Sequence, residues 1–352
     1  MKLGTVQNST APAEFHPARG PRTGGADDRD EAAVRVEHLS KSYRSNWTLR
    51  VTRGLEDLNL EVRRGEVFGY LGPNGAGKTT TLKILTGLLK PTSGQAWLMG
   101  EPVHRVSSRR NLGFLPEQPY FYDYLNGLEY LEMVAKLSGL GGADAGRQAR
   151  HWLGRVGLGA RARLVLRKYS KGMLQRLGLA GALVHSPELL ILDEPMSGLD
   201  PFGRHDVRDL ILEQRERGVT VLFSSHILPD VETLCDRVAI VIGGRLERVG
   251  TVSELVSEQG GSVEIRCAGA VVIEVPAPWR QALRLNERPG ETLFTLSDPR
   301  FLQPVLAWMV ESRLAIHAVT PQRGALEQLF LATARSATAS TAETTEPERR
   351  SA

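Results

Sequence analysis

Short apolar runs alternate with longer amphipathic stretches along the middle of the chain. Residues 66–71 are predicted to form a strand that enters a glycine-rich turn, and residues 78–88 follow it with helical spacing. Residues 189–192, 219–223 and 238–242 are apolar runs, which is typical of strands buried on both faces of a parallel sheet. Because strands and helices alternate, the pattern predicts an α/β fold with a mostly parallel sheet.

The pattern changes twice and predicts two further structural units. Residues 122–184 have helical spacing throughout, which indicates a mainly helical subdomain at about 119–184 inside the α/β domain. After residue 259 the apolar positions alternate, which indicates a small α+β domain. The elements expected there are strands within 263–267 and 271–275, a helix over 301–310, a strand over 314–319 and a last helix over 325–334.

The two ends of the chain are poor in residues that could build a core. Residues 1–32 hold Pro12, Pro17 and Pro21 and an acidic cluster, and residues 336–352 contain no Leu, Ile, Val or Phe. Segments of this composition bury too little apolar surface to fold. We therefore expect disordered tails at 1–32 and 336–352, an α/β domain at 33–258 and the small α+β domain at 259–335.

Composition and charge narrow the classes of function. The net charge of +4 is small for 352 residues, so a nucleic-acid-binding surface is not expected. No apolar run approaches the roughly 18–20 residues that span a bilayer. The two cysteines, Cys235 and Cys267, favour a reducing compartment over a disulfide framework. We expect an intracellular chain whose membrane role, if it has one, comes through a partner.

The turn after the first predicted strand contains a phosphate-binding motif. Residues 72–79 fit the pattern G-x-x-x-x-G-K-[ST]. The glycines let backbone N–H groups point inward at phosphate oxygens, and the following helix presents its positive N-terminal end to the same anion. Lys78 is expected to reach the β- and γ-phosphates, and Thr79 to supply an oxygen to Mg²⁺. The nucleotide-binding residues predicted here are Gly72, Pro73, Asn74, Gly75, Ala76, Gly77, Lys78, Thr79 and Thr80.

A pair of carboxylates follows the apolar run at 189–192. Asp193, at the end of a buried strand, is suited to hold Mg²⁺ directly or through water. Glu194 lies where the chain leaves the sheet, and a carboxylate at this position could polarise the attacking water. The pair therefore supplies the second metal anchor and the catalytic base that a nucleotide triphosphatase requires.

Further motifs accompany this pair in a fixed order. Residues 169–176 precede Asp193, residues 197–200 follow it, and His226 comes directly after another predicted strand. In this order, over residues 34–254, the chain resembles the ATP-binding subunits of ABC transporters. No Asn-Lys-x-Asp guanine motif is present, so a GTPase is not expected.

The resemblance implies roles for residues outside the phosphate-binding motif. Tyr43 occupies the position of the aromatic residue that stacks on adenine, an interaction worth on the order of 1–3 kcal/mol. Ser170 and Gly172 match the signature segment, which contacts the γ-phosphate of ATP held by the opposite protomer. Asp200 matches the residue that links the two sites across the dimer, and His226 matches the switch histidine at the γ-phosphate.

Two segments depart from the usual family pattern. The signature typically begins Leu-Ser-Gly-Gly-Gln, whereas residues 169–173 are Tyr-Ser-Lys-Gly-Met, so Lys171 adds a donor near the phosphate. Residues 112–118 resemble the loop that links Mg²⁺ to the membrane partner, and the usual glutamine position holds Glu117. We assign the metal role to Glu117; a one-residue shift to Gln118 is the alternative.

The resemblance implies two competing functions. The first is a subunit that dimerises around two MgATP, with itself or another ATPase subunit, and drives export through a separate ABC-2-type permease at the inner face of the cell membrane. The single ATPase unit and the C-terminal extension ending at 325–331 favour this function. The second is an ABC ATPase acting on ribosomes or DNA. Such proteins usually carry two ATPase units or a long coiled coil, and the sequence has neither.

Overall fold

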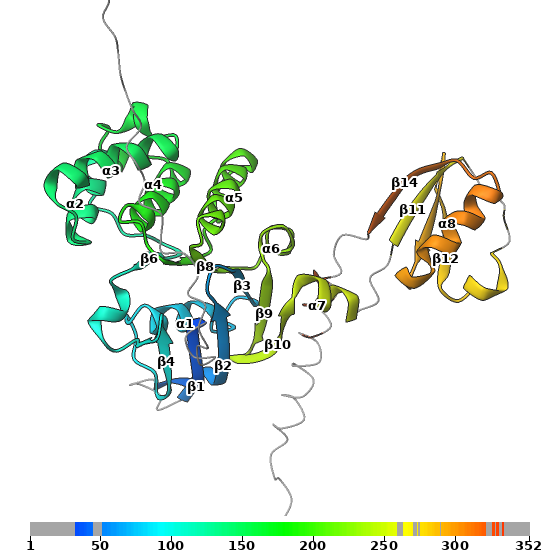
Figure 1. The fold of residues 1–352 in the computed structure, drawn as a ribbon, viewed down its shortest axis with the longest axis horizontal. Helices are drawn as coiled ribbons and strands as arrows, with labels where there is room; N and C mark the ends of the chain where they lie inside the picture. Colours follow the sequence, from blue (N-terminus) through cyan, green and yellow to red (C-terminus); the bar gives the residue numbers. More distant parts are fainter. Residues whose placement is uncertain are drawn as a thin grey trace, which may run out of the picture.

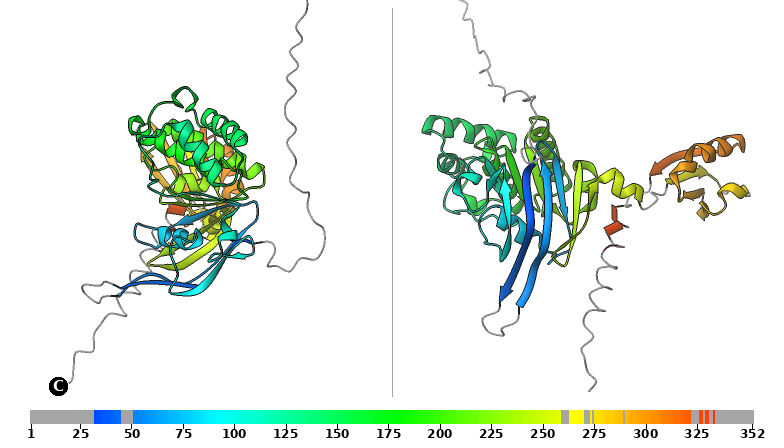
Figure 2. Two further views of the ribbon diagram at one scale, coloured as in Figure 1. Left: turned by 90° about the vertical axis from the view of Figure 1, so that its left-hand side faces the viewer. Right: turned by 60° about the horizontal axis from the view of Figure 1, so that its bottom comes forward.

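The computed structural model describes residues 32–44, 51–258, 263–269, 273, 275–288, 290–321, 326–327, 329–330 and 333. The described residues between 32 and 258 form a large α/β part, and those between 263 and 321 contribute a smaller sheet with one helix. Figures 1 and 2 show these two parts lying apart from each other, with α7 (Val252–Glu258) at the edge of the large part that faces the small one.

A six-stranded sheet forms the centre of the large part. Five strands run parallel, and β10 pairs antiparallel with β9 at one edge. The order is β10 (Arg245–Thr251), β9 (Arg237–Ile242), β3 (Val67–Leu71), β8 (Thr220–Ser225), β7 (Leu189–Asp193) and β6 (Leu112–Leu115). Every residue of β3, β7 and β8 is buried, which explains the apolar runs within these strands. The predicted α/β fold with a mostly parallel sheet is confirmed.

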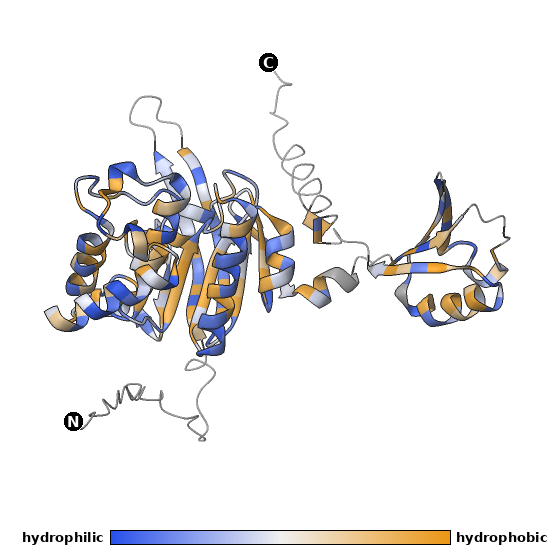
Figure 3. Ribbon diagram, turned by 90° about the horizontal axis from the view of Figure 1, so that it is seen from above, coloured by the Kyte–Doolittle hydropathy of each residue, from blue (hydrophilic) through white to orange (hydrophobic). Residues whose placement is uncertain are grey.

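The two faces of this sheet belong to two different cores. Successive side chains of a strand point to opposite faces, so Leu190 and Leu192 of β7 join one cluster while Leu189 and Ile191 join the other. The first cluster includes residues of α5 (Pro201–Glu216) and of the helical subdomain. In Figure 3 the central strands are largely orange, whereas much of the surrounding helical surface is blue.

The second cluster is shared with an antiparallel sheet that the sequence did not predict. Its order is β2 (Val51–Arg63), β1 (Ala32–Arg44), β4 (Ser93–Leu98) and β5 (Glu101–Pro102). Strand β1 begins one residue inside the segment expected to be a tail. Helix α1 (Lys78–Leu85) packs in the same core and ends three residues earlier than predicted, where Gly87 takes a left-handed φ of 73° and closes the helix.

The predicted helical subdomain lies between β6 and β7. It contains α2 (Gly127–Leu137), α3 (Gly142–Arg155) and α4 (Lys171–Leu183), with short 3-10 turns at Gly159–Arg161 and Leu166–Lys168. Asn126 and Glu129 form a reciprocal capping box at the start of α2, which fixes the point where this helix begins. After β8, the short helix α6 (Leu228–Leu234) leads back to β9.

The small part is an antiparallel sheet covered by one helix. Its order is β12 (Leu283–Arg288), β13 (Glu291–Leu296), β11 (Val263–Ala268) and β14 (Ile316–Pro321), and α8 (Leu302–Glu311) packs Val305 and Met309 against it. Strands β12 and β13 were not predicted. Ile273 and Val275, expected in a strand, instead lie in irregular chain that packs on this core.

The last predicted helix packs differently from the sequence assignment. Leu326 and Leu329 are helical, but both are buried in the core cluster of the large part rather than with the small sheet. Their spacing of three residues gives one apolar stripe, and Leu234 and Leu255 belong to the same cluster. The assignment of this helix to the domain at 259–335 is therefore wrong. Within the described residues, none of the helices combines the length and apolarity needed to cross a membrane.

Candidate nucleotide site

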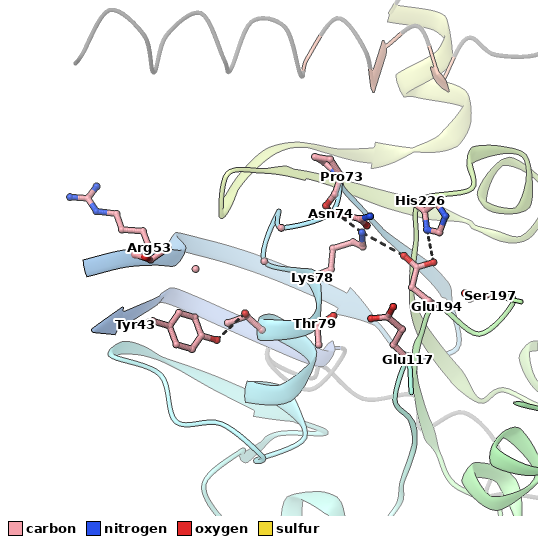
Figure 4. Close-up of a pocket in the computed structure, with 15 residues that line it drawn as sticks. Tyr43, Arg53, Pro73, Asn74, Lys78, Thr79, Glu117, Glu194, Ser197 and His226 are labelled. Atoms are coloured by element: carbon pink, nitrogen blue, oxygen red, sulfur yellow. Dashed lines mark hydrogen bonds and ion pairs between the residues drawn. The ribbon is translucent and has the colours of Figure 1, made fainter. Parts of the chain in front are cut away.

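A cavity of about 480 Å³ opens where β3 and β7 of the central sheet end. Ligands of open α/β sheets bind at these carboxyl ends of parallel strands. Figure 4 shows that the lining side chains come from the phosphate-binding loop and the start of α1, from both strands of the β1–β2 pair and from the chain beyond β6, β7 and β8. The lining residues are Tyr43, Thr52, Arg53, Gly54, Pro73, Asn74, Gly75, Gly77, Lys78, Thr79, Thr80, Glu117, Glu194, Ser197 and His226.

The phosphate-binding loop joins β3 to α1 and is packed without room for side chains at its ends. A Cβ atom on Gly72 would lie 2.5 Å from the carbonyl oxygen of Val241 in β9. Gly77 has a φ of 98° and directly precedes Lys78, the first residue of α1. The Lys78 ammonium is buried and donates to the Gly72 carbonyl at 2.6 Å. The loop thus holds a cation at the N-terminus of a helix, where an anion is favoured.

Glu194 lies between two cationic or titratable groups. Its Oε1 is 3.5 Å from Lys78 Nζ, and its Oε2 is 2.9 Å from His226 Nδ1 (Figure 4). Lys78 and Glu194 are buried, whereas the His226 side chain is 52% exposed. The predicted base and the predicted switch histidine are therefore in contact, beside the lysine expected to bind phosphate.

Ser224 connects the carboxylate of Asp193 to the backbone of Glu194, and the sequence analysis missed it. Its hydroxyl donates to Asp193 Oδ1 at 2.6 Å, and the Glu194 N–H donates to the same hydroxyl oxygen at 3.0 Å. Ser224 pairs with Asp193 in the parallel register of β7 and β8. A serine at the end of a strand beside an acidic strand end was the signal that could have identified it. Asp193 is buried and is not one of the described residues that line the cavity.

The oxygen ligands near Lys78 suit a magnesium ion. The Thr79 hydroxyl and the Glu117 carboxylate line the cavity, and Asp193 immediately precedes Glu194. In the described part of the chain, no group of three or more His, Cys, Asp or Glu side chains forms a metal cluster. This small set of oxygen donors fits Mg²⁺, which usually takes one or two protein carboxylates and completes its shell with phosphate and water. Gln118 is absent from the described lining.

Tyr43 lies at the opposite end of the cavity from Glu194 (Figure 4). Its Oη is 3.1 Å from Thr80 Oγ1 in α1, and the Lys41 ammonium lies 5.5 Å from the ring centroid. Tyr43 pairs with Thr52 across the β1–β2 ladder, which brings Thr52, Arg53 and Gly54 to the cavity. The sequence analysis missed these three because they follow no motif; only the pairing of β1 with β2 reveals them.

The signature segment and Asp200 lie outside the described lining of this cavity. Ser170 is the N-cap of α4 and accepts from the Met173 N–H, and Asp200 caps α5 by accepting from the Gly203 N–H at 2.8 Å. The side chain of Lys171 passes close to Gly198, so the two segments touch. Ser170 and Asp200 are exposed and Gly172 is half-buried. The predicted residues thus form two separate groups, one in the cavity and one on the surface.

Comparison with known proteins identifies the family. A family model described as ABC transporter matches residues 55–197. An uncharacterized ABC transporter ATP-binding protein of Synechocystis is 44% identical over 65% of this chain and 65% of its own length. The daunorubicin resistance ATP-binding protein DrrA3 of Streptomyces coeruleorubidus is 38% identical over 86% of this chain and 95% of its own length.

A solved structure shows the same fold. The dimeric post-hydrolysis structure of the ATP-binding cassette MJ0796 with ADP and Pi has a TM-score of 0.58 and 25% identity, over 62% of this chain and 98% of that one. The long match to DrrA3, the family model and this structure agree with the order of motifs and with the cavity formed by them. The chain therefore belongs to the family of ABC transporter ATP-binding proteins and is an ATP hydrolase of the ABC type.

Proposed function

We propose that the chain is the ATPase subunit of an ABC exporter, and that it dimerises around two MgATP to drive a separate ABC-2-type permease. One observation supports the proposed dimer: the residues expected at the phosphates form two groups. Lys78, Glu194 and His226 line one cavity, whereas Ser170 and Asp200 are exposed outside its described lining. A second copy placed head to tail would bring its own Ser170 to the open side of the cavity.

Different residues of the cavity bind different parts of the nucleotide. Tyr43 stacks on the base, and Lys78 with the backbone N–H groups of the loop binds the phosphates. Glu194 takes the proton of the attacking water, and His226 holds the carboxylate in place through the 2.9 Å contact. Thr79, Glu117 and Asp193 would hold Mg²⁺, which supplies charge neutralisation at the phosphates.

In the observed arrangement Lys78 bonds to the Gly72 carbonyl and pairs with Glu194. Phosphate oxygens would replace both partners, since a triphosphate carries more negative charge than a neutral carbonyl or a single carboxylate and is also favoured at the helix N-terminus. Glu194 then keeps His226 as its partner and is free to face the water. Nucleotide binding and activation of the base are thereby linked through one ammonium group.

Export through a permease is supported by the kinship with a daunorubicin resistance protein, which matches nearly its full length to this chain. In such a complex the subunit would sit at the inner face of the cell membrane, and the cargo would be recognised by the permease.

The proposal is tested by purifying the tagged chain from detergent-solubilised membranes. We expect a membrane protein with several spans and no ATPase unit to copurify, and the complex to hydrolyse ATP faster than the isolated chain. Copurification with ribosomal proteins or DNA instead would favour the alternative function and contradict the exporter.

A further inference from the structure

The turn between β9 and β10 forms backbone hydrogen bonds to both sides of the nucleotide cavity. The Gly244 N–H donates to the carbonyl of Ala76 in the phosphate-binding loop at 3.1 Å. The Gly244 carbonyl accepts from the N–H of Glu56 in β2 at 2.8 Å. A single residue therefore links the loop that binds the phosphates to the strand that borders the base end of the cavity.

Three backbone segments meet at the carbonyl of Gly54 with no room for a side chain. A Cβ on Gly77 would lie 2.5 Å from this oxygen, and a Cβ on Gly244 would lie 2.9 Å from it. Real Cβ atoms do not approach backbone oxygens this closely, so both positions depend on glycine. Gly244 also has a φ of 86°, which only glycine adopts without strain. The loop is thus wedged against β2 and the turn.

An ion pair fixes the turn to β2 from outside. Arg245, the residue after Gly244, lies 2.8 Å from Glu56, and this hydrogen bond is the largest effect that holds the pKa of Glu56 below its usual value. The other end of the phosphate-binding loop packs on the β9–β10 hairpin, because the Val241 carbonyl of β9 lies next to Gly72. The hairpin therefore contacts both ends of the phosphate-binding loop.

We propose that Gly244 is a positioning residue that sets the place of the phosphate-binding loop in this ATPase. The proposal rests on the nucleotide role proposed above for that loop. A side chain at position 244 pushes on Gly54 and shifts the Ala76 carbonyl, so the loop N–H groups no longer converge on the phosphates. The expected loss of affinity arises at the phosphate end of the site. It is therefore the same for ligands with and without a base.

Gly243 provides a matched control because it is the neighbouring residue of the same turn. Its φ of 57° is also left-handed, but a Cβ there would meet nothing within 4 Å. The variants Gly244→Ala and Gly243→Ala both place alanine at a positive φ, and only Gly244→Ala adds the steric contact with Gly54. Binding of MgATP and of inorganic tripolyphosphate with Mg²⁺ is measured calorimetrically for both, at a temperature where circular dichroism shows each to be folded.

We expect Gly244→Ala to weaken both ligands by about tenfold or more and Gly243→Ala to stay within about twofold of the parent. Tyr43→Ala should lose affinity for MgATP and keep it for tripolyphosphate, which separates the two ends of the site. Parental tripolyphosphate binding by Gly244→Ala, or equal losses in both glycine variants, would overturn the proposal. A parent that binds neither ligand contradicts the nucleotide assignment itself, and the proposal with it.

Hydrogen exchange of the parent tests the same idea without a variant, should Gly244→Ala not fold. If the turn holds the loop, then tripolyphosphate should slow exchange of the Gly244 amide, whose acceptor is Ala76. Slower exchange in the loop with an unchanged Gly244 amide would show that the loop is ordered independently of the turn, and the proposal would be wrong.

Discussion

Glu194 has a backbone conformation that residues other than glycine seldom adopt. Its φ is 51°, while the preceding residue ends a regular parallel strand. The hydrogen bond to Ser224 and the contacts of the carboxylate with Lys78 and His226 hold it there. Such strain persists where the surroundings over-determine it, and here it turns the carboxylate out of the sheet and into the cavity.

Lys78→Ala should weaken ATP binding by about tenfold to a hundredfold and slow hydrolysis with it. The variant removes a charge-assisted hydrogen bond to phosphate worth roughly 1.5–3 kcal/mol and leaves Glu194 without its cationic partner. Lys83→Ala is the control, since Lys83 lies exposed on the same helix. Nucleotide titration and phosphate release measure both. Parental binding and turnover by Lys78→Ala would show that this lysine is not at the phosphates.

Glu117→Gln should change the Mg²⁺ dependence of hydrolysis and leave nucleotide binding largely intact. Two unit charges 4 Å apart interact by about 4 kcal/mol at an effective dielectric of 20, so loss of this carboxylate at a metal should be measurable. Gln118→Ala should do much less, because Gln118 is not among the described lining residues. Rates are compared over a Mg²⁺ titration. A crippled Gln118→Ala beside a parental Glu117→Gln would shift the loop assignment by one residue.

The residues of the cavity that could be predicted are those that belong to a local sequence motif. Lys78, Thr79 and Glu194 belong to such segments, and the structure gathers them around one space. Ser224 acts through strand pairing with Asp193, and Gly54 through its backbone contacts with Gly77 and Gly244. A single sequence specifies neither of these contacts. Contacts between segments that are distant in sequence are therefore the part of the site that sequence patterns do not reveal.

At the scale of elements, His185 joins the helical subdomain to the central sheet. It follows α4, and its Nε2 lies 3.2 Å from the Leu112 carbonyl of β6. Its Nδ1 is buried and has no hydrogen-bond partner among the described residues, so a second proton on the ring would be a buried, unpartnered charge there. Burial lowers the pKa of His185 for this reason, while the Leu112 contact opposes the shift.

We expect acid to destabilise the parent more than His185→Gln. The unfolded chain takes up the proton near the ordinary histidine pKa of about 6.5, whereas the folded chain takes it up only at lower pH. The stability contributed by neutral His185 is therefore present above that pH and lost below it. Unfolding by urea at pH 7.5 and 5.5 measures the change for both proteins. An equal loss of unfolding free energy in both would show that His185 is not the responsible group.

Elements were predicted well where burial on two faces gives a strand an apolar run, as in β7 and β8. The antiparallel strands β1, β2, β12 and β13 were missed. In β2 buried and exposed positions alternate along its second half, and its long ladder with β1 carries several register shifts. Such strands are stable only with their partners, so their own sequences indicate them weakly.

At the scale of the molecule, the chain passes through the small sheet and returns to the large part. Leu326 and Leu329 are buried in the core of the large part, beyond β14 in sequence. The C-terminal helix thereby contributes to the stability of the ATPase, and the small sheet is inserted between two segments of one core. A domain boundary placed by composition alone cannot reveal this return.

Leu329→Ala should lower the stability of the ATPase part by about 2–5 kcal/mol, as expected for a truncated buried leucine. Val310→Ala is the control, since Val310 is 65% exposed on α8. Calorimetry with and without MgATP identifies the unfolding transition of the ATPase as the one that nucleotide raises. A Leu329→Ala variant that lowers only a transition unresponsive to MgATP would contradict the packing of this helix with the ATPase part.

Ser170 and Asp200 are exposed outside the described lining of the cavity, so we propose that the site is complete only in a dimer. Glu194→Gln keeps the shape of the base and removes its charge, so bound ATP is not hydrolysed and the closed pair accumulates. Light scattering of Glu194→Gln with saturating MgATP is the direct measurement. We predict twice the mass of one chain with MgATP, the mass of one chain without it, and a monomer for Glu194→Gln combined with Ser170→Arg. A single-chain mass at every MgATP concentration, with nucleotide bound, would contradict the shared site.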